Sequence, residues 1–237
     1  GELFVGCAGG ADLNVSMQFK EDTYIPEGDV AVKISLTGLK GGHSGVDIHL
    51  GRANANKLMF RFLKEAVRDY GARLSSVDGG SLRNAIPREA FAVITIPGDN
   101  VEALWELVSD YQEMYRYEYK GIEHNINFTA EMTDMPATLI PEEIQDDLIN
   151  AIEGCQNGVI SMLVDFPGTI ESSTNLAIVK SSNEMIEIQI LVRSSSESRK
   201  EAVCSRWLRR MAAEYRFADP ENHAASLFGF VRKEAGG

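Results

Sequence analysis

The 237-residue sequence predicts an α+β fold, namely an open-faced two-layer sandwich in which an antiparallel sheet carries helices on one face. Two observations support this prediction. Segments with strand-like alternation are joined by short turns, and amphipathic helical segments stand between pairs of them. The same pattern occurs in both halves of the chain, which indicates two half-units related in architecture but not by a sequence repeat. With 44% hydrophobic residues, the chain can build a substantial core.

The first strand and helix are predicted from their different periods. Residues 29–39 alternate apolar and polar side chains, as in a half-buried strand. Residues 51–70 place apolar side chains three to four positions apart, which predicts an amphipathic helix. Gly71 is the expected end of that helix, since glycine readily adopts the left-handed conformation of a helix C-terminus.

Two more strands and a second helix complete the first half. Strands are predicted around 72–80 and at 90–98. Asn100 can then cap a helix whose apolar positions continue to Tyr115. The order of the first half is therefore β-α-β-β-α or close to it.

The second half repeats this arrangement. Pro141 stands at a plausible first helical position, and the helix is expected to end near Gly154. Strands follow at 174–182 and 184–194. A last helix is expected to begin with Ser194 and Glu197 in capping-box spacing.

The two ends of the chain differ from the middle. Residues 1–20 are interpreted as a hinge or as the edge of another domain, and residues 21–217 as the main α+β domain. Residues 218–237 show little periodicity and are assigned no role.

Composition narrows the function classes. A formal net charge of -12 disfavours nucleic acid as a partner. No run approaches the roughly 18 apolar residues of a membrane span, and the start lacks the pattern of a signal peptide. Cys7, Cys155 and Cys204 have no zinc-site spacing and suit reduced thiols. We therefore expect a soluble, cytoplasmic protein with neither a nucleic acid nor a membrane as its partner.

The densest candidate for chemistry is the segment 38–57, in which glycines flank His43 on both sides. Glycines let the backbone approach a ligand closely, and a histidine there can donate to a developing oxyanion or transfer a proton. The alternative is a turn histidine in solvent, which spacing alone favours. His49 follows six residues later, but no carboxylate or cysteine stands close enough to make a convincing metal site.

Two further residues are candidates for ligand binding. Asn84 precedes an Ile-Pro step, so its backbone is expected to be extended or turning, with the side-chain amide free to bond a ligand. Arg193 ends a strand on the face opposite its apolar residues, where a guanidinium can bind a carboxylate with two hydrogen bonds. A turn-stabilising asparagine and a solvated arginine remain the alternatives.

The known catalytic motifs are absent. The sequence has no GxSxG, HExxH, Walker or GxGxxG motif, and its four histidines form no obvious metal-binding set. No metal ligand is therefore assigned. Judged by motifs alone, the chain holds no complete active site.

A family resemblance is carried by two long motifs. The string GGHSGVDIHLGRANANKLMFRFL, followed by GGSLRNAIPREAFAVI, closely resembles the bacterial aminoacyl-histidine (Xaa-His) dipeptidases of the co-catalytic zinc peptidase family. GELFVGCAGG before these motifs, and QNGVISM, ESSTNLAIV and EIQILVRSS after them, occur in the same order. The resemblance spans residues 1 to about 215.

The resemblance implies a lid domain inserted in a split catalytic domain. It implies that the parent enzyme binds two zinc ions through residues outside this chain, so the chain alone is expected to bind no zinc and to be inactive. The implied partners are a dipeptide substrate, the remaining catalytic domain and, as a possibility, a second copy of the chain. His43 is similar to the lid histidine that bonds the scissile carbonyl oxygen, whereas Asn84 and Arg193 are similar to residues that contact the substrate and its terminal carboxylate. The alternatives are a non-enzymatic dimerisation or ligand-binding module, or the lid of a related zinc amidohydrolase.

Overall fold

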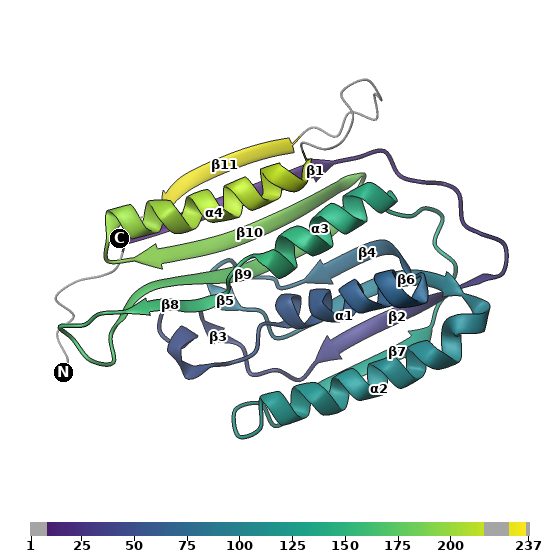
Figure 1. The fold of residues 1–237 in the computed structure, drawn as a ribbon, viewed down its shortest axis with the longest axis horizontal. Coiled ribbons are helices and arrows are strands. Elements are labelled where there is room, and N and C mark those ends of the chain that lie inside the picture. The colour runs from purple at the N-terminus through teal and green to yellow at the C-terminus, as the bar shows by residue number, and fades with distance from the viewer. Residues whose placement is uncertain (1–8, 216–227, 236–237) are drawn as a thin grey trace.

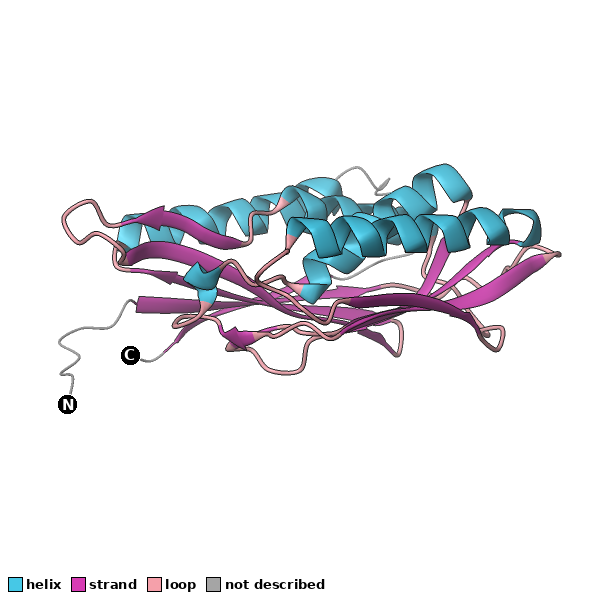
Figure 2. Ribbon diagram, turned by 90° about the horizontal axis from the view of Figure 1, so that it is seen from below, coloured by secondary structure: helices cyan, strands magenta, loops and turns pink. Residues whose placement is uncertain are grey.

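A single large sheet with helices on one face organises the protein (Figure 1). The computed structural model describes residues 9–215 and 228–235. Within them, nine strands form one sheet in the order β11-β1-β10-β9-β4-β6-β2-β7, with β8 beside β9 and every pairing antiparallel. Seen edge-on, the four helices lie above the layer of strands (Figure 2). The predicted open-faced α+β sandwich is therefore confirmed.

The first half-unit has the order β-α-β-β-α-β, and its strands lie in the order β4-β6-β2-β7. Its last strand was not expected from the sequence, because this strand is at an edge of the sheet and buries little apart from Phe128. The elements are β2 (Asp29–Thr37), α1 (Ala55–Tyr70), β4 (Arg73–Gly79), β6 (Ala90–Pro97), α2 (Val101–Glu118) and β7 (Asn127–Met132).

The second half-unit repeats the same order, with its strands arranged β9-β10-β1-β11. Its elements are β1 (Gly9–Gln18), α3 (Glu142–Gly154), β9 (Ile170–Ser182), β10 (Met185–Ser194), α4 (Glu197–Tyr215) and β11 (Phe228–Ala235), with β8 (Gly158–Met162) added beside β9. The first half-unit is thus inserted between the first strand and the first helix of the second. The two halves join where β4 pairs with β9.

Both ends of the described chain belong to this sheet. Residues 9–18, interpreted from the sequence as part of a hinge or of another domain, form an inner strand between β10 and β11. The reason is packing, since Leu13 and Val15 belong to the buried core. Residues 228–235, which had no assigned role, pair with β1, and residues 1–8, 216–227 and 236–237 lie outside the described part. A domain boundary at residues 21 and 217 remains a prediction.

Local hydrogen bonds correct the predicted start of the first helix. It begins at Ala55 rather than near residue 51, because Asn54 accepts a hydrogen bond from the backbone of Lys57 (3.2 Å) and caps it. Before this cap, a short 3-10 helix spans Ile48–Leu50. The expected end at Gly71 is confirmed, with φ of 71° in the left-handed region.

Two predicted caps differ in the structure. Asn100 does precede α2, but its amide donates to the carbonyl of Tyr70 (2.9 Å) instead of capping its own helix. At the start of α4 the capping serine is Ser196, whose hydroxyl accepts from the backbone of Arg199 (3.4 Å). Ser194, expected in that role, accepts from the backbone of Ser196 (3.1 Å) because it still belongs to β10.

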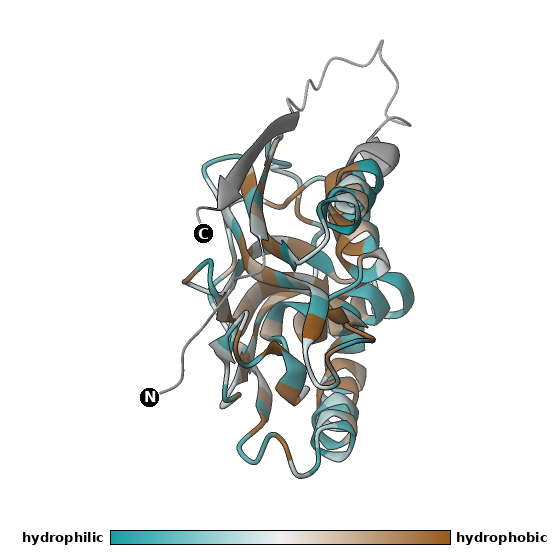
Figure 3. Cartoon of the chain, turned by 90° about the vertical axis from the view of Figure 1, so that its left-hand side faces the viewer, coloured by the Kyte–Doolittle hydropathy of each residue, from teal (hydrophilic) through white to brown (hydrophobic). Residues whose placement is uncertain are grey.

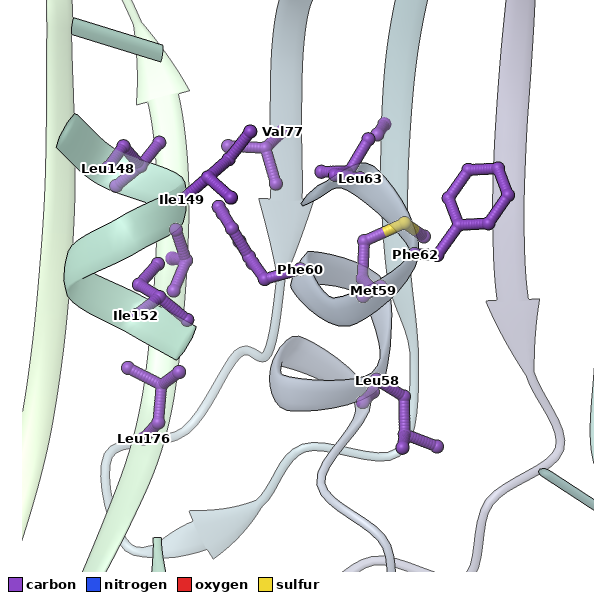
Figure 4. Close-up of a cluster of buried hydrophobic side chains, with 14 of the residues drawn as sticks. Leu58, Met59, Phe60, Phe62, Leu63, Val77, Leu148, Ile149, Ile152 and Leu176 are labelled. Carbon is purple, nitrogen blue, oxygen red and sulfur yellow. The ribbon is translucent and has the colours of Figure 1, made fainter. Parts of the chain in front are cut away.

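The core fills the space between sheet and helices, where hydrophobic residues gather (Figure 3). Phe60 of α1 is fully buried and points toward Ile149 of α3, so the core is continuous across the two half-units (Figure 4). Of the three cysteines, Cys155 and Cys204 are buried, and Cys7 lies outside the described residues. Burial raises the pKa of Cys155 to about 12, so this thiol stays protonated at neutral pH.

Candidate functional site

The candidate site lies on the sheet face that the helices leave uncovered. Val192 of β10 is fully buried and faces the core. Because successive side chains of a strand point to opposite faces, the next residue, Arg193, points to the uncovered face. The β2–α1 and β4–β6 loops meet there as a small sheet of two strands, β3 (Gly42–His43) and β5 (Ala85–Ile86). The amide of Asn175 on β9 donates to the Ala85 carbonyl (2.8 Å) and so attaches this small sheet to the large one.

The ring of His43 is held by its own turn. Its Nδ1 atom accepts hydrogen bonds from the backbone N–H groups of Gly45 and Val46, each at 3.1 Å. A nitrogen that accepts carries no proton, so these hydrogen bonds assign the proton of the neutral ring to Nε2. The side chain is exposed, and no residue in the described part of the chain bonds to Nε2. The turn therefore presents one N–H donor to a ligand.

Arg193 and His43 meet at Gly45. A Cβ atom added at Gly45 would lie 3.2 Å from Nε of Arg193 and 3.3 Å from Cε1 of His43. Any side chain at this position would force the guanidinium or the imidazole to shift by a few tenths of an ångström. The Arg193 Nε atom is buried and has no hydrogen-bond partner among the described residues. A buried donor without an acceptor costs free energy.

Backbone pairing places Asn84 beside His43. Its carbonyl accepts from the N–H of Ser44 (2.9 Å), and it directly precedes Ala85, the residue paired with His43. The Asn84 side chain is exposed. The structure thus brings together the three residues that the sequence singled out, although 150 positions separate the first from the last.

One ion pair nearby was not predicted. Asp12 on β1 is 2% exposed, and its carboxylate pairs with the guanidinium of Arg83, next to Asn84. The two residues are 71 positions apart, so no spacing rule connects them. No sequence signal marks this pair, because Asp12 stands at a polar position of an alternating strand. Only its burial shows that the charge needs a partner.

The remaining histidines do not join this site. His49 lies in the short 3-10 helix and is exposed, and His124 is also exposed. His223 is outside the described residues. No group of three or more His, Cys, Asp or Glu side chains that could hold a metal ion occurs within residues 9–215 and 228–235 as described, so zinc does not fit any set found there. In the same residues, no helix is long and apolar enough to cross a membrane.

Comparison with known proteins assigns this architecture to a class. Residues 34–123, which run from within β2 through α2 and include both site loops, match the model of the peptidase dimerisation domain of the M20 family. Over these residues the chain is therefore similar to an M20 peptidase dimerisation domain.

The relatives are dipeptidases. The chain is 38% identical over 205 residues to the cytosol non-specific dipeptidase of Escherichia coli (strain K12), an alignment that covers 86% of this chain and 42% of that protein. It superposes with a TM-score of 0.87 and 35% identity on the aminoacylhistidine dipeptidase of Vibrio alginolyticus, covering 96% of this chain and 44% of that one. The resemblance to the aminoacyl-histidine dipeptidases is confirmed, and the chain spans less than half the length of either relative.

Proposed function

We propose that the chain is the substrate-capping lid of a zinc-dependent dipeptidase that hydrolyses aminoacyl-histidine-type dipeptides. The names of the two relatives support the reaction class. The observation that carries the proposal is the meeting of His43 and Arg193 at Gly45, on the uncovered face of the sheet. Residues 21–217 are proposed as the main body of this lid, with β1 and β11 completing its sheet.

His43 is proposed to donate its Nε2 proton to the oxygen of the scissile carbonyl. As the tetrahedral state forms, negative charge develops on that oxygen, and a donor held in place strengthens its bond at that moment. The two backbone amides at Nδ1 support this role, because they hold the ring in one orientation and one tautomer. The residue would complete an oxyanion-binding site without changing its own protonation state.

Arg193 and Asn84 are proposed to hold the substrate. The guanidinium of Arg193, at the end of β10 and beside the turn of His43, would receive the terminal carboxylate. The Asn84 amide, exposed beside His43, would bond the peptide backbone of the substrate. Both residues would act in the ground state and the transition state alike.

Zinc and the general base are proposed to belong to the rest of a longer parent chain, which would be this lid's main partner. The described residues offer no set of ligands for the metal, so no step is assigned to it here. That the chain alone binds no zinc stays a prediction, which metal analysis after dialysis tests. A cytoplasmic location is proposed on the printed name of the Escherichia coli relative.

Kinetics of the full-length parent test the proposal. His43→Ala is expected to lower kcat on the order of 100- to 1000-fold, or about 3 to 4 kcal/mol, with little change in folding. Arg193→Ala is expected to raise KM instead, because the carboxylate is present before and during the reaction. His49→Ala is the matched control and should be close to neutral. A His43→Ala enzyme with kcat within about threefold of the wild type would contradict the oxyanion contact.

A further inference from the structure

The turn that holds the ring of His43 is itself closed by a carboxylate. Oδ2 of Asp47 accepts a hydrogen bond from the backbone N–H of His43 (2.8 Å), and the N–H of Asp47 donates to the His43 carbonyl (2.9 Å). These two bonds join the ends of the five-residue segment 43–47. Gly45 and Val46, whose amides bond Nδ1 of the ring, lie inside the closed segment.

We propose that Asp47 is a positioning residue for His43, and this inference rests on the proposed function of that histidine. Asp47 does not touch the ring. It fixes the backbone of the turn, so that two consecutive N–H groups converge on Nδ1 and leave the proton on Nε2. Without the carboxylate, the His43 N–H loses its acceptor and the turn loses the bond that sets its width.

Arg52 holds the carboxylate in place from the other side. Its Nη1 atom lies 3.3 Å from Oδ2 of Asp47 and donates to the carbonyl of Gly41 at 2.5 Å. The guanidinium therefore links the residue before β3 to the acid that closes the turn. Both charged side chains are only about a quarter exposed, at 23% for Arg52 and 27% for Asp47, so solvent screens their attraction less than on an open surface.

The glycine at position 42 is required by the same contacts. A Cβ atom there would lie 2.2 Å from Nη1 of Arg52 and 2.6 Å from Oδ2 of Asp47. Its φ of 145° is also one that side-chain-bearing residues rarely adopt. The glycine pair before His43 therefore makes room for the Asp47–Arg52 pair, which explains part of the glycine-rich motif in physical terms.

Nuclear magnetic resonance of the 237-residue chain tests the proposal without any enzymatic assay. In the wild type, we expect scalar couplings across the hydrogen bonds from the Gly45 and Val46 amides to Nδ1, and a ring proton on Nε2. In Asp47→Ala, both couplings should disappear. The hydrogen-exchange rates of these two amides should rise about tenfold, because the loss of one hydrogen bond corresponds to roughly that factor. Unchanged couplings in Asp47→Ala, or a wild-type proton on Nδ1, would overturn the proposal.

Two variants separate positioning from general damage. Asp47→Asn keeps an acceptor oxygen and should retain the couplings, which distinguishes the hydrogen bond from the charge. Asp134→Ala removes one exposed loop carboxylate for which the structure gives no hydrogen bond or ion pair, and it should leave the turn unchanged. Loss of the couplings in Asp134→Ala would show that the readout reports overall stability, and it would remove the support for Asp47.

Kinetics of the full-length parent distinguish this inference from the proposed function. If both hold, Asp47→Ala lowers kcat with little change in KM, and Asp47→Asn restores most of it. If the couplings vanish in Asp47→Ala while His43→Ala leaves kcat intact, the positioning of the ring stands and the proposed function fails. If His43→Ala lowers kcat but Asp47→Ala does not, the positioning role is wrong and the proposed function stands.

Discussion

At the scale of single residues, the absence of a side chain at position 45 sets the geometry of the site. Gly45 is not in the left-handed region, so an alanine there meets no backbone strain. Its methyl group would nevertheless lie 3.2 Å from Nε of Arg193 and 3.3 Å from Cε1 of His43, closer than most such contacts. One of the two side chains must then move by a few tenths of an ångström.

We therefore predict that Gly45→Ala leaves the fold intact but weakens catalysis by the full-length parent. The expected loss in kcat/KM is about 10- to 100-fold, because small displacements of positioned groups are costly in a preorganised site. Steady-state kinetics measure the loss, and thermal unfolding monitors stability. Gly121→Ala is an unsuitable control because of its φ of 87°, whereas Ser35→Ala on β2 is a suitable one. Kinetics of Gly45→Ala equal to wild type would show that the contact at this position is unimportant.

At the scale of elements, one lysine connects the two half-units. Lys57 lies in the first turn of α1, and its Nζ donates to the carbonyls of Ile152 (2.6 Å) and Cys155 (3.1 Å) at the end of α3. The Ile152 carbonyl also accepts from the backbone N–H of Cys155 (3.4 Å), and a cation suits the negative end of the helix dipole. Burial lowers the pKa of Lys57, opposed by the nearby Glu153 carboxylate. The hydrogen bonds therefore offset the cost of burying the amine.

We predict that Lys57→Met destabilises the chain by about 1 to 3 kcal/mol, because it removes the lysine donor from the carbonyls at the end of α3 and leaves Glu153 without its ion pair. Urea unfolding followed by circular dichroism measures the change. Lys64→Met, an exposed position on the same helix, is the matched control and should stay within about 0.5 kcal/mol of the wild type. Equal stabilities of the two variants would show that this cap contributes nothing.

At the scale of the whole molecule, the two half-units pair their sheets within one chain, as two single units would pair theirs in a dimer. Their sheets join through β4 and β9, so an edge that each half would otherwise expose is covered internally. Of the described strands in the main path, only β7 and β11 remain at edges.

We predict that the isolated chain is a monomer, because the internal half-unit already occupies the pairing edge. Sedimentation at several concentrations should give a mass near 26.1 kDa throughout. A mass that rises towards twice this value with concentration would show that β7 or β11 extends the sheet between copies.

Much of the fold and the site could be predicted from local signals in the sequence. The alternation in β2 and the helical spacing in α1 act over a few residues, and they determined the element types and the buried faces. Each candidate side chain, at His43, Asn84 and Arg193, was recognisable from its immediate neighbours in the motifs that carry the family resemblance.

Only the tertiary structure decided which distant segments lie together. The edge strand β7 has too little burial to show a period, and β1 is an inner strand only because β10 and β11 pair with it. The same holds for Asp12 with Arg83, since a long-range ion pair leaves no spacing in the sequence. The hydrogen bonds at Nδ1 of His43 join residues only two and three positions apart in the sequence. They nevertheless depend on the backbone dihedrals of a turn that, in our proposal, Asp47 and Arg52 hold in place. Sequence thus determined most of the elements and the candidate residues. Long-range pairing decided the remaining strands and the arrangement of the whole, because the free energy of that pairing comes from contacts between segments that no local pattern connects.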